Sequence, residues 1–149
     1  MAVDVVTEIV IRRPRAEVAT YAANPDNAPR WYANIEPAEW QTPPPLGIGS
    51  RITFVAHFLG RELVYTYEVS DYVPGERLVL RTASGPFPME TTYAWESAPG
   101  GATRMTLRNR GAPSGFSRLM APLMAPMIRR ENRKDLARLK QMLEQQGPS

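Results

Sequence analysis

The sequence predicts an α+β domain in which a curved antiparallel sheet wraps around one long C-terminal helix. Between residues 51 and 110, segments of alternating apolar and polar residues are separated by turns rich in glycine and proline, which is typical of an antiparallel meander. From residue 115 to residue 146, apolar side chains recur at spacings of three and four, which indicates a helix with one buried stripe. The length of 149 residues fits a single domain over residues 1–149 with one core.

The first third of the chain is expected to supply a strand, two short helices and a loop before the meander. Val5, Thr7 and Ile9 lie at alternate positions, as in a half-buried strand, and Pro14 suits the first position of a helix. Residues 24–26, Asn-Pro-Asp, interrupt that helix. The expected elements are a strand at 3–11, helices at 16–23 and 26–32, a second strand at 35–41 and a rigid proline loop at 42–49.

The meander is predicted to have one buried face and one solvated face. Its strands are expected at 51–59, 61–70, 77–82, 89–96 and 103–110. Because side chains alternate across a strand, residues of the same parity share a face. The face expected to be buried carries Ile52, Phe54, Ala56, Phe58, Leu63, Tyr65, Tyr67, Val69, Leu78, Leu80, Met89, Thr91, Tyr93, Trp95, Met105 and Leu107. The opposite face carries Arg51, Thr53, His57, Glu62, Glu68, Arg77, Arg81, Glu90, Glu96, Arg104 and Arg108, whose mixed charges suit weak cross-strand ion pairs.

The C-terminal helix is expected to cover the apolar face of this sheet. Its stripe consists of Met124, Ile128, Asn132, Leu136, Leu139 and Leu143. The basic residues between 129 and 140 fall mostly off that stripe and are interrupted by Glu131 and Asp135, so we interpret them as a solvated helix face. Pro122 and Pro126 each remove a backbone donor, which predicts a bend before about residue 127.

Composition excludes several classes of function. The chain has no cysteine and one histidine, which rules out disulfides, thiolate chemistry and metal sites built from several histidines. A net charge of +3 is too small to indicate nucleic acid, and the basic helix lacks interleaved aromatic residues. The longest apolar run, residues 119–128, is too short to span a membrane. We expect a cytoplasmic monomer or homodimer without cofactor, metal, nucleic-acid partner or integral membrane association.

The order of elements resembles the helix-grip fold. The chain is similar to the START-like (SRPBCC) superfamily, which includes lipid carriers, plant pathogenesis-related class 10 proteins and bacterial polyketide cyclases/dehydrases. Residues 85–95 (GPFPMETTYAW) and 101–107 (GATRMTL) resemble the polyketide cyclase/dehydrase-like branch, as do residues 11–18 (IRRPRAEV) and 71–78 (DYVPGERL). The resemblance covers nearly the whole chain. It implies a deep cavity between sheet and helix that holds a hydrophobic or aromatic ligand, and it implies no particular catalytic residue.

Three tyrosines on the expected inner face, Tyr65, Tyr67 and Tyr93, are the leading candidates for ligand contacts. A buried hydroxyl without a partner costs roughly 1–3 kcal/mol, so these hydroxyls must meet each other, water or a ligand. The alternative is that their rings are ordinary core. The full set of predicted ligand-binding residues is Phe54, Phe58, Tyr65, Tyr67, Thr91, Tyr93, Trp95, Met105, Met124, Met127, Ile128 and Asn132. Trp31, Tyr32 and Trp40 are candidates for the cavity mouth or, alternatively, for anchoring the short helices.

Other candidate residues are less consistent with a site. His57 has a suitable side chain for a general base, but its parity places it on the solvated face. Glu131 precedes Asn132 and is expected in solvent, with an inward orientation as the alternative. Gly47 and Gly49 lack the strand-to-helix setting of a phosphate-binding loop.

Three functions remain open from the sequence. The first is binding of a small hydrophobic or aromatic molecule, lipid-like or polyketide-like, between sheet and helix. The second is a cyclase- or dehydratase-type enzyme that uses the same cavity with tyrosine hydroxyls as donors; an enzyme would need an ionisable group inside, and alternation offers only tyrosines. The third is a partner-binding module that uses an exposed Met120–Met127 segment, which is otherwise a lid or part of the core.

Overall fold

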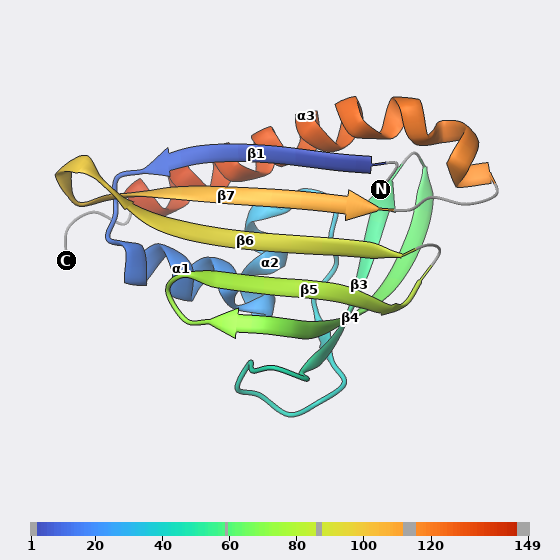
Figure 1. Cartoon of the computed structure of the whole chain (residues 1–149), viewed down its shortest axis with the longest axis horizontal. Coiled ribbons are helices and arrows are strands. Elements are labelled where there is room, and N and C mark those ends of the chain that lie inside the picture. The colour runs from blue at the N-terminus through green and yellow to red at the C-terminus, as the bar shows by residue number, and fades with distance from the viewer. Residues whose placement is uncertain (1–2, 59, 86–87, 112–115, 146–149) are drawn as a thin grey trace.

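Seven antiparallel strands form one sheet in the order β1-β7-β6-β5-β4-β3-β2, and one long helix lies along it (Figure 1). The computed structural model describes residues 3–58, 60–85, 88–111 and 116–145, and the side chains of all of these except Phe58 and residues 116–121. The strands are β1 Val3–Ile11, β2 Glu39–Trp40, β3 Arg51–Phe58, β4 Arg61–Val73, β5 Arg77–Ser84, β6 Met89–Ala98 and β7 Ala102–Gly111.

The helices occupy the concave side of the sheet. They are α1 Arg15–Ala23, α2 Ala28–Trp31 and α3 Phe116–Gln145, with two 3-10 turns, η1 Pro25–Asn27 and η2 Pro99–Gly101. The predicted helix at 26–32 is therefore a 3-10 turn followed by a single α-helical turn. The side chain of Asn24 accepts a hydrogen bond from the Asp26 amide at 3.0 Å and so caps η1. With these helices and the meander, the predicted helix-grip architecture is confirmed.

The predicted strand at 35–41 is wrong in its extent. Only Glu39 and Trp40 form a strand, β2, and Ile35 makes a single bridge to Ala56 of β3. Pro37 lies between these two pairings and has no amide to donate, so the ladder cannot continue through it.

The sheet curves because β4 is irregular. Its pairing with β5 shifts register between Thr66 and Tyr67 and again between Val69 and Asp71. Such bulges bend a strand and increase its twist. Figure 1 shows the result: β3 and β4 turn away from the plane of β1, β7 and β6 toward the first turns of α3.

The core lies between α3 and the sheet. Leu136, Leu139 and Leu143 of α3 are at most 1% exposed and belong to one apolar cluster with Trp95 and Met105. Nearer its beginning, Met124 is packed with Val3 and Val5 of β1. Pro122 and Pro126 lie inside α3, and its first turns are bent relative to the rest, as expected (Figure 1). No helix in the described part of the chain combines the length and apolar character needed to cross a membrane.

Candidate functional site

Two adjacent hollows of about 170 Å³ each lie between the sheet and the helices. The first, which we call the sheet hollow, is lined by Ala28, Tyr32, Ile35, Phe54, Ala56, Tyr65, Tyr67, Leu80, Thr91, Tyr93 and Asn109. The second, the helix hollow, is lined by Tyr32, Asn34, Ile35, Ala56, His57, Leu63, Tyr65, Met89, Met124, Ile128, Glu131, Asn132 and Asp135. They share part of their walls, namely Tyr32, Ile35, Ala56 and Tyr65.

Strand alternation brings the tyrosines of the sheet hollow together. Tyr65 pairs with Phe54 across β3 and β4, and Tyr67 lies two residues further on the same face. The rings of Tyr65 and Tyr67 are 5.8 Å apart, and the Phe54 ring meets Tyr67 edge-on at 6.1 Å. Gly85 lies against this wall, since a Cβ atom at that position would be 2.5 Å from Cδ1 of Tyr65. The wall therefore depends on the absence of a side chain at residue 85.

The hydroxyls of Tyr32, Tyr67 and Tyr93 form hydrogen bonds within the hollow. The hydroxyls of Tyr32 and Tyr93 are 2.6 Å apart. Burial raises the pKa of Tyr93 and of Tyr65 to about 12. It also raises the pKa of Tyr67, and a hydrogen bond with Thr91 opposes this rise. These phenols are consequently neutral near pH 7 and can donate hydrogen bonds.

The helix hollow contains a carboxyl group. Asp135 is 6% exposed, and burial raises its pKa to about 6. Its Oδ1 accepts a hydrogen bond from the backbone amide of Ala33 at 3.2 Å, which partly offsets the rise. Asp135 and Tyr32 both line the helix hollow. Burial raises the pKa of Tyr32 and of Tyr93, and the charge of Asp135 adds a smaller rise to both. A carboxyl group with a pKa close to neutrality can take up and release a proton under ordinary conditions.

Asn132 lies one helical turn before Asp135 in the same wall. The residue is 7% exposed, and its Nδ2 is buried without a hydrogen-bond partner among the described residues. A buried amide group without a partner costs about 1–3 kcal/mol. Asn132 thus carries an unused donor in the wall of the helix hollow.

The rim of the helix hollow is more exposed. His57 belongs to the solvated face, as predicted, and also borders the hollow, with its Nε2 2.9 Å from Oε2 of Glu36. One possible metal-ligand atom from each of Glu36, His57 and Glu62 lies within 4.8 Å of the other two, but all three residues are exposed. We interpret this group as a cluster of exposed polar side chains. Glu131, expected in solvent, is half-buried at the rim and forms an ion pair with Lys134 at 3.9 Å.

The structure places eight of the twelve predicted ligand-binding residues in these walls. Phe54, Tyr65, Tyr67, Thr91 and Tyr93 line the sheet hollow, and Met124, Ile128 and Asn132 line the helix hollow. Trp95 and Met105 do not line them, because both are at most 2% exposed within the core. Met127 is half-buried and borders neither hollow. The side chain of Phe58 lies outside the described residues.

Of the three residues predicted at the mouth, Tyr32 borders both hollows. Trp31 is fully buried in the core, which excludes it from a mouth. Trp40 lines a different surface groove, beside Pro44 and Pro45, and its indole donates to Asp26 at 2.9 Å. Trp31 and Trp40 therefore anchor the short helices and the proline loop, which was the alternative interpretation.

Sequence reasoning missed several polar wall residues, among them Asn109 and Asp135. Asn109 has the same parity on β7 as Met105 and Leu107, so alternation alone would have placed it inside, where it accepts a hydrogen bond from Thr91 at 3.2 Å. Asp135 was assigned to the solvated helix face, which is wrong. It lies three residues after Asn132 and four before Leu139, and this spacing puts it on the buried side despite its charge.

Comparison with known proteins agrees with this geometry. The family model described as "Polyketide cyclase / dehydrase and lipid transport" matches residues 2–144. No curated protein matches the chain significantly.

Several solved structures share the fold. The protein TTHA0849 from Thermus thermophilus has a TM-score of 0.82 at 19% identity, with 97% of this chain and 99% of that chain covered. The ZhuI aromatase/cyclase from a Streptomyces species has a TM-score of 0.78 at 14% identity over 95% of this chain and 93% of that one. A START superfamily protein from Mycobacterium smegmatis has a TM-score of 0.72 at 12% identity over 96% and 95%. At these identities the likeness concerns the fold.

Proposed function

We infer that this chain, which belongs to the polyketide cyclase/dehydrase and lipid transport family within the START-like superfamily, binds a small, largely apolar molecule in its two hollows. The observation that carries this proposal is the presence of two adjacent hollows whose shared wall contains Tyr32 and Tyr65. An internal space with apolar walls and a few oriented polar groups is typical of a ligand site. The family description, which includes lipid transport, also favours binding of an apolar molecule.

The energetics of the walls support this role. Apolar surface buried on binding contributes roughly 25 cal/mol per Å², less the cost of association. The aromatic rings of Phe54, Tyr65 and Tyr67 supply such surface, and the neutral phenols supply hydrogen bonds that orient the ligand's oxygens. A flat, ring-containing molecule with few oxygen atoms satisfies both conditions.

A filled-cavity variant tests the proposal. Ala56 borders both hollows, so Ala56→Trp places an indole in the space where the ligand would lie. Ala83→Trp, at an exposed position of β5, is the matched control. With naphthalene as the probe in calorimetric titrations, wild type and Ala83→Trp should bind alike. Ala56→Trp should bind about tenfold more weakly or worse, since losing roughly 60 Å² of contact amounts to about 1.5 kcal/mol. Equal binding by both variants would contradict the proposal.

Native mass spectrometry provides an independent test. Protein purified from its own host should carry a bound molecule whose mass disappears from the Ala56→Trp variant. That mass would also identify the chemical class of the ligand. The same adduct on the filled variant would place the ligand elsewhere.

A second candidate function, a cyclase- or dehydratase-type enzyme, is favoured by Asp135. Its pKa of about 6 allows the carboxylate to accept a proton from a carbon beside a carbonyl group, while a tyrosine hydroxyl donates to the developing enolate oxygen. The name of the similar ZhuI aromatase/cyclase agrees with this candidate. Multiple turnovers of a β-hydroxyketone, with loss of water detected by mass spectrometry and abolished in Asp135→Asn, would establish it. Binding without turnover would leave the carrier function.

The structure gives less support to a partner-binding module. Of the large apolar side chains described between residues 122 and 127, Leu123 is 57% exposed, whereas Met124 is 6% exposed and packed on β1. A single exposed leucine is not the contiguous apolar patch that this function requires. Met120 lies among the side chains that are not described. The cytoplasmic location, the oligomeric state and the absence of nucleic acid remain predictions.

A further inference from the structure

The helix hollow has a polar end that is chemically distinct from the tyrosine wall. Asn132 and Asp135 lie three residues apart on α3, so their side chains are neighbours on one helix face. Both line the helix hollow, and both are more than nine-tenths buried. No other residue with a side-chain carboxyl or amide in that wall is as deeply buried among those described, since Asn34 is exposed and Glu131 is half-buried.

Each of the two residues has one hydrogen-bonding position left over. Asn132 Nδ2 is buried without a partner among the described residues. Asp135 Oδ1 is occupied by the Ala33 amide, while Oδ2 accepts no hydrogen bond from the described part of the chain. The wall of the hollow therefore contains one unpaired N–H donor and one carboxyl acceptor on neighbouring residues of the helix face. Leaving the buried Asn132 donor unused costs about 1–3 kcal/mol, which is a large share in a domain stabilised by only about 5–15 kcal/mol.

We propose that Asn132 and Asp135 form a head-group site for a neutral ligand that carries a carbonyl oxygen and a nearby hydroxyl group. This proposal rests on the ligand-binding function inferred above and names the class of molecule. The carbonyl oxygen accepts from Nδ2 of Asn132, and the hydroxyl donates to Oδ2 of Asp135. The apolar remainder of the ligand extends past the shared wall at Tyr32 and Tyr65 into the sheet hollow.

Other head groups fit this pair less well. A carboxylate or phosphate would be repelled by Asp135 and by Glu131 at the rim. A cationic amine would satisfy Asp135 but would leave the Asn132 donor facing a positive charge. A plain hydrocarbon would leave the buried Asn132 donor unpaired, with the cost of one unmade hydrogen bond.

Three probes of increasing polarity test the assignment: naphthalene, methyl naphthyl ketone, and the same ketone with a hydroxyl meta to the carbonyl. For the wild type we expect the ketone to bind about threefold to tenfold more tightly than naphthalene, and the hydroxyketone to gain about tenfold more, as expected for one neutral and one charge-assisted hydrogen bond. Binding driven by apolar burial alone would give the opposite order, because the oxygenated probes are better solvated by water.

Two substitutions separate the two contacts. Asn132→Leu keeps the size of the side chain and removes the donor, so it should abolish the advantage of the ketone over naphthalene. Asp135→Asn keeps an oxygen for the Ala33 amide but replaces the second acceptor with an NH₂ group, so it should abolish the further gain of the hydroxyketone. Arg133→Ala, at an exposed position on the same helix, should leave all three affinities unchanged. Retained naphthalene binding shows in each case that the hollow is intact.

The outcomes distinguish this inference from the proposed function. If naphthalene binds but the oxygenated probes gain nothing in the wild type, the head-group site is wrong and the binding function stands. If the gains persist in Asn132→Leu and Asp135→Asn, the site is also overturned. If naphthalene does not bind the wild type at all, both proposals fail.

Discussion

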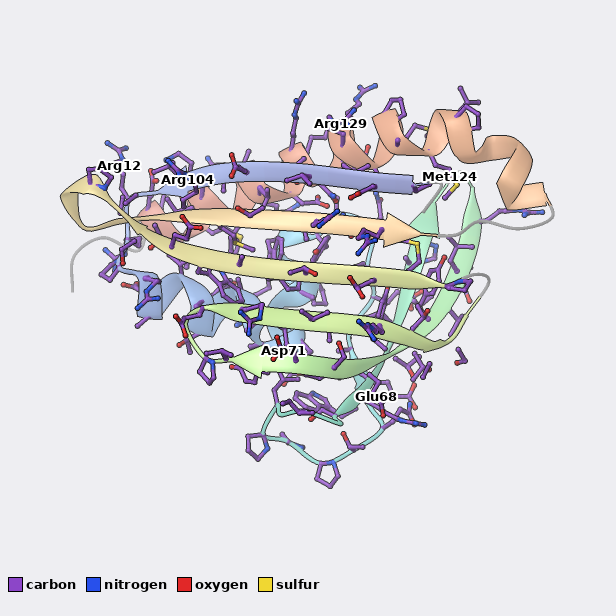
Figure 2. The ribbon with its side chains drawn as sticks, in the orientation of Figure 1. Arg12, Glu68, Asp71, Arg104, Met124 and Arg129 are labelled. Atoms are coloured by element: carbon purple, nitrogen blue, oxygen red, sulfur yellow. The ribbon has the colours of Figure 1, made fainter. Side chains whose placement is uncertain are left out.

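The two halves of the interface between α3 and the sheet are filled to different degrees. In the close-packed half, toward the C-terminal end of α3, Leu139 and Leu143 are at most 1% exposed and share a cluster with Trp95 and Met105. In the hollow half, toward its beginning, the helix faces the helix hollow, with Asp135 in the wall. Figure 2 shows Met124, which lines the helix hollow, at one end of the sheet and Arg12, whose amide donates to Glu144 near the end of α3, at the opposite end.

This contrast shows how one helix serves two purposes. The close-packed half supplies the stability of the domain, since buried aliphatic side chains each contribute about 1.5–3 kcal/mol. The hollow half holds an unpaired donor and a buried carboxyl group, which reduce stability and are tolerated because the close-packed half compensates. The bulges in β4 bend β3 and β4 away from the plane of the other strands, toward the first turns of α3.

Truncations on the two halves of α3 should have unequal effects, and this is the largest difference that we predict. Leu139→Ala leaves a cavity in the close-packed half and should lower the free energy of unfolding by about 2–5 kcal/mol. Ile128→Ala, beside the helix hollow, should cost roughly 1 kcal/mol, because its side chain is only half-buried. Urea denaturation at constant m-value measures both. Equal losses would mean that the two halves are packed alike.

A methyl group at residue 85 should deform the hollow half alone. Gly85 has a φ of 156°, and a Cβ there would lie 2.5 Å from the Tyr65 ring, so Gly85→Ala should cost about 1–3 kcal/mol and shift Tyr65 within the shared wall. Naphthalene binding should weaken as well. Gly75→Ala is the control, since its φ is also positive, at 81°, but the space around it is open. That variant should lose stability through backbone strain and keep its affinity for naphthalene.

The close-packed half could be predicted from the sequence more completely than the hollow half. The spacing of Leu136, Leu139 and Leu143 and the alternation of the strands depend on burial of apolar residues, which a one-dimensional pattern records. The same alternation correctly placed the inward-facing tyrosines. It could not show where the inner face is filled and where it is hollow, so Trp95 and Met105 were grouped with the cavity residues although they are core.

In the hollow half, the sequence prediction was wrong for a charged residue, Asp135. Asp135 was grouped with the charged residues of the solvated helix face, although its spacing from Asn132 and Leu139 places it on the buried side. Positions where such sequence rules fail are expected at functional or strained sites, which is consistent with the proposed head-group site. The mouth could not be predicted either, because the positions of Trp31 and Trp40 depend on how the short helices and the proline loop meet in three dimensions.

In the hollow half, a rise in pH should lower the free energy of unfolding, because the buried Asp135 becomes charged. The pKa of Asp135 in the folded protein, about 6, lies above its ordinary value of 3.8. The folded state is therefore most stable below pH 4, where the carboxyl is protonated, and it loses stability as the pH rises through 6 and the carboxyl ionises. Asp135→Asn removes this cost and should be more stable than wild type at pH 8 by about 1–2 kcal/mol, a value reduced from the full shift because the carboxyl borders a hollow. The advantage should disappear at pH 4, and urea denaturation at the two pH values measures it. Glu131, Lys134, Arg138, Tyr32 and Tyr93 surround the carboxyl and remain in both proteins.

The close-packed half should respond to pH in the opposite direction, with the smallest effect. Glu144 accepts hydrogen bonds from the Arg12 amide at 2.9 Å and from Lys140, which lower its pKa from 4.5 to about 2. Its ionisation therefore stabilises the folded state above pH 4.5, and this contribution is lost as the pH falls toward 2. Glu144→Gln should be less stable than wild type at pH 7 by up to about 1 kcal/mol, because surface pairs are screened by solvent, and equal to it near pH 2. A loss that is constant across this range would mean that shape, rather than charge, fixes the end of α3 to β1.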